Sequence, residues 1–381
     1  MSTPSRSFAQ WILSPPFPSF DFSESASAYL IWKGINVYVD LQERGLDLFT
    51  GPRAERLGIW REFRNFVRQA EAYYWAGSQV KDSSASLLYY YSMLNLAKAE
   101  LLTDPASRSQ ILHQEIHHGL SYRPTKAKTL AGDRVKVVQG VFPFLYRKRV
   151  SRPIGLDERI SVKRLLGNVP EIGWELDRAH MGSFQVAGGF HAVVMDDDEL
   201  WSLLALREPV AALTSNTATG KLFQRRFESV DPPRNWKDVF AFTKRLGPGY
   251  SFFQGKQSQP RSDRSLSGMK RSDIAKVMEG TWSDLAAITD ASTDEDYDLL
   301  ICPSLLRSRM LPMPASLARY ALMYYTSSLV RYKPSALDRN LHSSQAWLLD
   351  AFTNEAALPL LENALSGIEG RPKLYFGGLR T

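Results

Sequence analysis

The sequence predicts an α+β fold in which an N-terminal and a C-terminal helical zone pack into one helical bundle, with a β-rich module in the middle of the chain. Apolar residues recur at helical spacing over residues 51–130 and again over 306–381. Between these zones, residues 131–305 contain short runs rich in valine and phenylalanine that end at Gly, Pro or Asp. The segments 87–102 and 318–332 share paired tyrosines and small residues, as expected for two helices that pack together.

The N-terminal segment is expected to be irregular. Residues 1–50 are rich in proline, serine and aromatic side chains, which predicts an arm that lies across a neighbouring surface. Its aromatic residues include Trp11, Phe17, Phe20 and Phe22.

The N-terminal helical zone is expected to contain two helices. The first, over residues 53–80, has one apolar stripe facing a core and a second face with three arginines. These arginines are Arg61, Arg64 and Arg68. The second helix is expected over residues 84–102 and ends before Pro105.

The middle module is expected to mix short strands with helices. Strands are expected over residues 133–146, 183–195, 221–230 and 297–306. Helices are expected over residues 157–168, 198–207 and 272–288, the second of them capped by the acidic run from Asp196 to Asp198. Residues 255–273 have almost no apolar side chains, which predicts a mobile loop. After residue 305, helices are expected over 315–332, 343–353 and 355–367.

Composition restricts the class of protein. The chain has 381 residues, of which 44% are hydrophobic, and no apolar run approaches the ~20 residues of a membrane span. The N-terminus lacks the apolar core of a secretory signal, and the single cysteine, Cys302, excludes an internal disulfide. These features predict a cytoplasmic protein without membrane partners. No dinucleotide fingerprint, nucleophile elbow or zinc-ligand spacing is present, so we expect no cofactor and no metal.

Positive charge is concentrated in one segment. Between Arg123 and Arg152 the chain has nine basic residues and one acidic residue, Asp133, so the net charge of this segment is 9 − 1 = +8. The net charge of the whole chain is +7. Clustered cations attract polyanions and release their counterions. The segment therefore predicts binding to a polyanion, with nucleic acid favoured. The alternative is a solvated face that acidic stretches elsewhere in the chain neutralise.

The stretch HQEIHHGLSYR, residues 113–123, allows three interpretations. His113 and His117 are four residues apart, but Gln114 stands where a zinc protease needs glutamate, so a metal site is disfavoured. Arg108 and His113 have the spacing found in HEPN-type ribonucleases, which predicts a metal-independent ribonuclease. The third interpretation is an ordinary helix end near His117, with Gly119 as its left-handed cap.

A second set of polar residues lies among aromatic side chains. Tyr91, Asn95 and Lys98 share one face of the expected 84–102 helix, and Arg331 closes the helix that ends before Pro334. Together with His118, Lys98 and Arg331 are candidates for a basic pocket where the two helical zones meet. The alternative is that Lys98 extends to solvent and that Arg331 only stabilises the carboxyl end of its helix.

Five motifs in order resemble the bacterial YaaC-like family. They are LLYYYSMLNLAKAELL from residue 87, HGLS from residue 118, GVFPFL from residue 140, LLGNVPEI from residue 165 and SSLVRYKPSAL from residue 327. The resemblance covers about residues 60–365 and implies no settled biochemical activity. The family-signature positions that it identifies are Asn95, Lys98, His118, Gly119, Arg331, Tyr332 and Pro334.

These observations together predict a polyanion-binding protein. The candidate anion-binding residues are Lys98, His118, Arg123, Arg134, Lys136, Arg147, Lys148, Arg149 and Arg331. Two alternatives remain open at this point. One is a HEPN-like ribonuclease or defence effector that uses Arg108 and His113, and the other is a scaffold that binds a protein partner or a second copy of itself through residues 1–50.

Overall fold

The computed structural model divides the chain into two compact units. It describes residues 10–13, 27–80, 83–113, 116–122, 129–181, 187–196, 198–207, 213, 218–231, 250–263, 270–288, 290–293, 299–302, 313–332 and 346–370. One unit, called here the helical unit, comprises residues 25–184 and 314–375. The other, the sheet unit, comprises residues 1–24, 185–313 and 376–381. Helices from both ends of the sequence therefore share one core.

The helical unit contains most of the helices and a small sheet. Its elements before the sheet unit are α1 (Ala28–Asp40), α2 (Gln42–Leu46), α3 (Arg53–Ser78), α4 (Ser83–Leu102), α5 (Pro105–His113), β2 (His118–Ser121), η1 (Leu130–Gly132), β3 (Arg134–Gly140), α6 (Val141–Val150), β4 (Arg159–Ser161), α7 (Val162–Gly167), η2 (Pro170–Ile172) and α8 (Gly173–Arg178). Its elements after the sheet unit are α13 (Ala315–Tyr332) and α15 (Ala346–Glu369).

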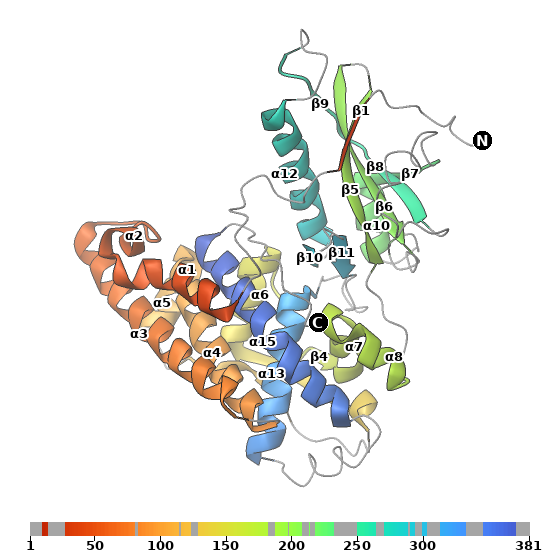
Figure 1. Ribbon diagram of the computed structural model, residues 1–381. Helices are drawn as coiled ribbons and strands as arrows, with labels where there is room; N and C mark the ends of the chain where they lie inside the picture. The colour runs from red at the N-terminus through yellow and green to blue at the C-terminus, as the bar shows by residue number, and fades with distance from the viewer. Residues whose placement is uncertain are drawn as a thin grey trace. The chain divides into compact units, whose positions relative to one another are not determined.

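Helix α4 is the centre of this unit. It packs against α3 on one side and against α13 and α15 on the other (Figure 1). Helix α13 is buried on every side from Ala315 to Leu329, and the polar side chains in this stretch include Arg319, which pairs with Glu171. Helix α3 instead buries one stripe, which includes Phe63, Val67 and Tyr74. The predicted bundle of N-terminal and C-terminal helices is confirmed.

The small sheet of the helical unit has the order β2-β3-β4, and both pairs are antiparallel. The predicted strand over 133–146 is wrong in its second half, because β3 ends at Gly140 and α6 begins at Val141. Pro143 lies in the first turn of α6, where a missing N–H breaks no helix hydrogen bond. The predicted helix over 157–168 is wrong at its start, where β4 forms.

The sheet unit is built on one antiparallel sheet. The sheet has the order β10-β11-β5-β6-β8-β7, with β1 paired to β5 and β9 paired to β6. Its strands are β1 (Gln10–Leu13), β5 (Ala187–Asp196), β6 (Glu199–Arg207), β7 (Phe227–Val230), β8 (Tyr250–Gly255), β9 (Gln259–Pro260), β10 (Asp290–Thr293) and β11 (Leu299–Cys302). Its helices include α10 (Ala218–Arg226) and α12 (Arg271–Ile288), which confirms the predicted helix over 272–288.

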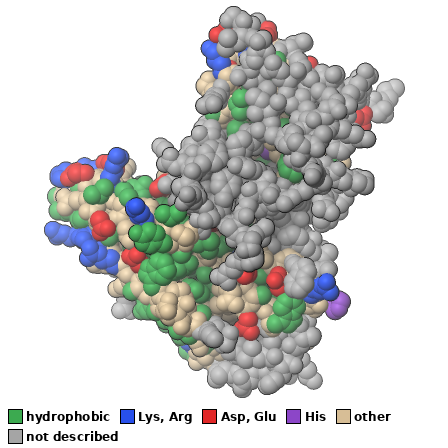
Figure 2. All heavy atoms as spheres, viewed as in Figure 1, with side chains coloured by type: hydrophobic (Ala, Val, Ile, Leu, Met, Phe, Trp, Pro, Cys, Tyr) green, Lys and Arg blue, Asp and Glu red, His purple; other side chains and the backbone are tan. Residues whose placement is uncertain are grey.

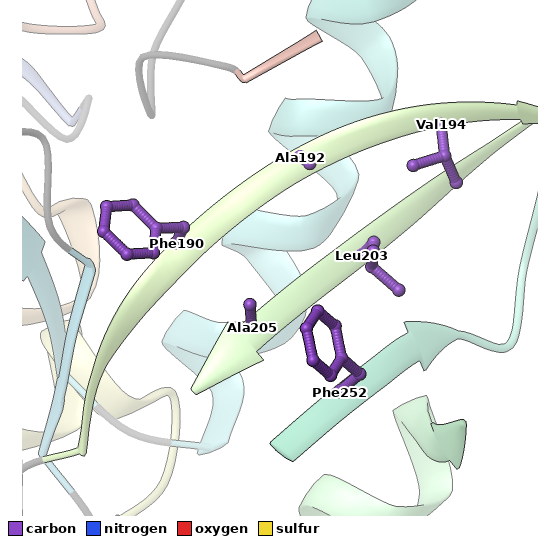
Figure 3. Close-up of a cluster of buried hydrophobic side chains, with 6 residues drawn as sticks. All are labelled: Phe190, Ala192, Val194, Leu203, Ala205 and Phe252. Carbon is purple, nitrogen blue, oxygen red and sulfur yellow. The ribbon is translucent and has the colours of Figure 1, made fainter. Parts of the chain in front are cut away.

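Both faces of this sheet are buried. On one face, Phe190, Ala192, Val194, Leu203, Ala205 and Phe252 form an apolar cluster (Figure 3). On the other face, Val193 and Leu200 pack with Val277 and Met278 of α12. This explains why the predicted helix over 198–207 is wrong: the segment is strand β6, and a strand buried on both faces lacks the polar alternation that identifies it. Asp198 accordingly lies in the connection between β5 and β6 and caps no helix.

Several other expectations are corrected. Residues 1–50 are not an irregular arm throughout, since they contain β1, α1 and α2. Trp11 lies in β1, whereas Phe17, Phe20 and Phe22 lie outside the described residues. Residues 259–260 of the expected loop form β9, and residues 264–269 lie outside the description. The expected strand over 221–230 is helix α10 up to Arg226. A single helix, α15, contains Pro359 and replaces the two helices expected after residue 343.

None of the described helices is long and apolar enough to cross a membrane.

Candidate anion-binding site

The structure brings together the three residues that the sequence analysis placed in a basic pocket. Lys98 comes from the last turns of α4, His118 begins β2, and Arg331 lies in the last turn of α13. Arg331 and Lys98 are close enough to His118 that both lower the pKa of its imidazole. We call Lys98, His118 and Arg331 the cationic cluster. All three side chains are partly buried.

Aromatic rings line the cationic cluster. The ring of His118 lies 5.6 Å from that of Tyr90 and 6.0 Å from that of Tyr324, measured between centroids. The guanidinium of Arg331 lies 5.9, 5.5 and 4.8 Å from the ring centroids of Tyr90, Tyr91 and Tyr332 respectively. The ammonium of Lys98 lies 5.4 Å from the ring centroid of Phe66. Cations over aromatic faces are stabilised by the ring quadrupole, although less than by a carboxylate.

Helix α4 holds Arg331 in position through Tyr91. Nη1 of Arg331 donates a hydrogen bond of 3.0 Å to the Tyr91 hydroxyl, and the ring of Tyr91 packs 5.4 Å from that of Tyr73. Asn95, a family-signature residue on the same helix, donates its side-chain amide to the carbonyl of Tyr91 at 3.0 Å. The side chain of Asn95 thus bonds a backbone carbonyl of its own helix, while the side chain of Tyr91 contacts Arg331.

Two glycines position His118 at the start of β2. The pairing of β2 with β3 is irregular between His118 and Leu120, as in a β-bulge, and bulges commonly redirect a side chain beside a functional site. Gly119 has a φ of 82° and Gly140, on the facing strand, has a φ of 146°. A Cβ on either glycine would meet backbone atoms of the other strand or its connection. Both positions therefore require glycine.

The interpretation of Gly119 as a helix cap is wrong. Helix α5 ends at His113, and Gly119 lies within a strand. Gly119 does have the left-handed backbone that the sequence suggested. The crossing of β2 and β3, rather than a helix end, imposes this conformation. The amide of Val141 completes this crossing with a 2.9 Å hydrogen bond to the carbonyl of His117.

The cationic cluster has no acidic partner in the part of the chain that the structure describes. No ion pair involves Lys98 or Arg331 there, and two polar atoms, Nδ1 of His118 and Nε of Arg331, are buried without a hydrogen-bond partner. Burial lowers the pKa of His118, and Arg331, Lys98 and His117 lower it further. Burial also lowers the pKa of Lys98. Uncompensated positive charge is costly when it is buried, so an anion at this position would be stabilising.

A family model described as YaaC-like Protein matches residues 59–366. The chain belongs to the YaaC-like family. No curated protein and no solved structure matches it. The matched region contains the whole cationic cluster and the two glycines at His118. Among the signature positions, Tyr332 is 65% exposed at the end of α13, and Pro334 lies outside the described residues.

The described cations in the basic segment of this YaaC-like protein do not converge on one surface. Arg123 lies outside the described residues, as do Lys126 and Lys128. Arg134 is exposed at the start of β3. Lys136 makes a 2.5 Å ion pair with Asp157. Arg147 donates from Nη2 to the hydroxyl of Ser107 at 3.1 Å.

Lys148 and Arg149 point into the helical unit. Arg149 donates two hydrogen bonds, of 3.1 and 2.5 Å, to the carboxylate of Glu100, a side chain that is fully buried. Nζ of Lys148 lies 3.7 Å from the same carboxylate and donates to the carbonyls of Glu100 and Gly367, both at 2.8 Å. We call Glu100, Lys148 and Arg149 the Glu100 network. Its two cations neutralise an internal carboxylate, so they are not available to a polyanion.

The arginines of α3 lie on a mixed-charge surface. Figure 2 shows Lys and Arg side chains at the end of the helical unit formed by α2 and α3, with acidic side chains among them. Arg53 and Glu43 form a 2.6 Å ion pair there. Arg61 and Arg68 are exposed, and Arg64 packs 4.5 Å over the ring of Trp60. This arrangement is typical of a solvated face.

The structure uses Arg108 to support the fold. Its Nε donates to the carbonyl of Leu102 at 2.9 Å, its Nη1 donates to the carbonyl of Thr50 at 3.3 Å, and only 8% of the residue is exposed. The side chain of His113 lies outside the described part of the chain. Among the described residues, no group of three or more His, Cys, Asp or Glu side chains could hold a metal ion.

Sequence reasoning missed the aromatic walls of the site. Neither Tyr90 nor Tyr324 was among the candidate residues, although their rings pack against His118. The signal was nevertheless present, because both lie in the paired-tyrosine segments of α4 and α13. Neighbouring tyrosines on a helix point to different sides, so one of each pair can pack in the core while the next faces a site.

Proposed function

We propose that this protein binds nucleic acid and holds one backbone phosphate at the cationic cluster. The observation that carries the proposal is that Lys98 and Arg331 are partly buried and have no carboxylate partner among the described residues. A phosphate would supply the missing negative charge. It would also accept hydrogen bonds from the guanidinium of Arg331, since guanidinium groups match phosphate geometry.

Aromatic side chains favour a nucleic acid over a small inorganic anion. Tyr73 is 37% exposed and Tyr332 is 65% exposed beside the cluster, where each could stack on a base. The chain also leads from His118 directly into the basic residues that begin at Arg123. Stacking and phosphate contacts together are typical of single-stranded nucleic-acid binding.

The proposal is tested by fluorescence anisotropy of single-stranded RNA and DNA oligonucleotides over a range of salt concentrations. Arg331→Met should weaken binding by about tenfold to a hundredfold, the value of a charge-assisted hydrogen bond. It should also reduce the slope of log affinity against log salt by about one. Arg68→Met, an exposed arginine of α3, is the matched control and should bind like the wild type.

Two results would overturn the proposal. One is undetectable binding of the wild type at low salt. The other is binding that Arg331→Met leaves unchanged. If Arg134→Ala alone abolished binding, the anion contact would belong to the basic segment and the cluster would lose its assignment.

A further inference from the structure

We propose that the cationic cluster also cleaves RNA without a metal ion, with His118 as the general base. This inference rests on the proposed nucleic-acid binding. The 2′-hydroxyl of a ribose would attack the adjacent phosphorus while the bond from phosphorus to the 5′-oxygen of the next nucleotide breaks. The products are a 2′,3′-cyclic phosphate and a free 5′-hydroxyl, so the step consumes neither water nor an oxidant.

The surroundings of His118 suit a base. The crossing of β2 and β3 at Gly119 and Gly140 fixes its backbone, and the rings of Tyr90 and Tyr324 pack against its imidazole. Its Nδ1 is buried, so Nε2 is the nitrogen that would accept the proton. Because the pKa of His118 is lowered by burial and by its cationic neighbours, the imidazole is neutral at pH 7 and can accept the proton of the 2′-hydroxyl.

The two cations suit the rest of the reaction. Arg331 is anchored at Tyr91, so it can hold the phosphate and stabilise the additional negative charge that develops on its oxygens. Lys98 can donate a proton to the departing 5′-oxygen. Burial lowers the pKa of Lys98, which makes its ammonium a stronger acid than an exposed lysine. The reaction thus moves one proton onto His118 and one from Lys98, and exchange with water restores both groups.

The same geometry selects the substrate class. The reaction requires a 2′-hydroxyl, so DNA of the same sequence would be bound but not cut. Exposed Tyr73 and Tyr332 favour bases that are free to stack, which predicts single-stranded RNA over a duplex.

The test uses the full chain with end-labelled single-stranded RNA, in EDTA, under single-turnover conditions with the protein in excess. The wild type should produce fragments that end in a 2′,3′-cyclic phosphate. His118→Asn should reduce the single-turnover rate at saturating protein at least about a hundredfold, a loss that weaker binding cannot cause. His180→Asn, an exposed histidine with a left-handed backbone that asparagine tolerates, is the matched control and should cut normally.

The role of Lys98 has its own readout. Lys98→Met should cut ordinary RNA slowly even when saturated with it. It should recover on RNA with a 5′-sulfur leaving group, because a thiolate departs without protonation. A variant that was merely misfolded would not recover.

The outcomes separate this inference from the proposed function. RNA that is bound but left intact would overturn the inference and leave the binding proposal standing, whereas no binding would overturn both. Cleavage that persists in His118→Asn would remove the activity from this site. Cleavage that is lost in His113→Asn but not in His118→Asn would assign the activity to His113.

Discussion

The helical unit contains two groups of cations that differ in their partners. In the Glu100 network, Lys148 and Arg149 surround a carboxylate that is fully buried. In the cationic cluster, Lys98 and Arg331 contact aromatic rings, and no described carboxylate pairs with them. Both groups include a residue of α4, two positions apart in the sequence. Nearly opposite faces of one helix thus serve a structural ion pair and a candidate ligand site.

The difference shows that the density of charge along the sequence is a poor guide to a binding surface. Lys148 and Arg149 lie in the most basic segment of the chain, yet they neutralise Glu100 inside the fold. Lys98 and Arg331 are separated by most of the chain and lie in apolar helices, yet their charges stay unmatched among the described residues. Unmatched charge that is partly buried is the better indicator of an anionic ligand, because no carboxylate offsets the cost of burying it.

The largest expected effect is the loss of the carboxylate in the Glu100 network. Glu100→Gln should lower the free energy of unfolding by about 3–5 kcal/mol, since it leaves two partly buried cations without their buried partner. Urea denaturation of the full chain measures the change. Glu62→Gln, an exposed glutamate of α3, is the control and should change it by less than about 0.5 kcal/mol. A loss of under about 1 kcal/mol for Glu100→Gln would mean that this network is not structural.

A smaller effect is expected from pH at the cationic cluster. A bound phosphate favours the protonated form of His118, so affinity for an oligonucleotide without terminal phosphates should rise as the pH falls. Burial and its cationic neighbours lower the pKa of His118 in the free protein, so the rise should continue below about pH 6.5 and should amount to about tenfold for each pKa unit by which the phosphate raises it. Anisotropy titrations between pH 5 and 8 measure it. His118→Asn should remove this dependence, and a variant that kept the full dependence would assign it to another group.

The smallest effect is expected from the removal of a cation that has no acidic partner. Lys98→Met should leave the free energy of unfolding unchanged or raise it by up to about 1 kcal/mol, since methionine keeps the contact with Phe66 and needs no counterion. The urea assay used for Glu100→Gln makes the two groups directly comparable. A large loss of stability in Lys98→Met would show that Lys98 is a structural cation. The cationic cluster and the Glu100 network would then not differ in this respect.

Local pattern was a sound guide where one face of an element meets the core. The apolar stripe of α3 and the bounds of α12 lie close to the positions that the sequence predicted. The same reasoning was wrong for β6, because a strand buried on both faces reads like a buried helix. It was also wrong for the start of α6, where valine and phenylalanine suggested a strand but Pro143 fits the first helical turn.

The candidate site was partly predictable for a related reason. Lys98, His118 and Arg331 stood out because each was polar in an apolar or glycine-containing motif. The fate of Lys148 and Arg149 could not be read in the same way, because their partner Glu100 lies about 48 residues away on another helix. Nor could Arg108 be recognised as a support for the carbonyls of Thr50 and Leu102.

By itself the sequence determined the family, the α+β class and the pairing of N-terminal with C-terminal helices, since these depend on composition, order and periodicity along the chain. Only the tertiary structure decided which cations are neutralised and which are not, because an ion pair depends on distances between segments that the chain brings together from far apart. The crossing of two glycines that presents His118 was likewise a property of the fold.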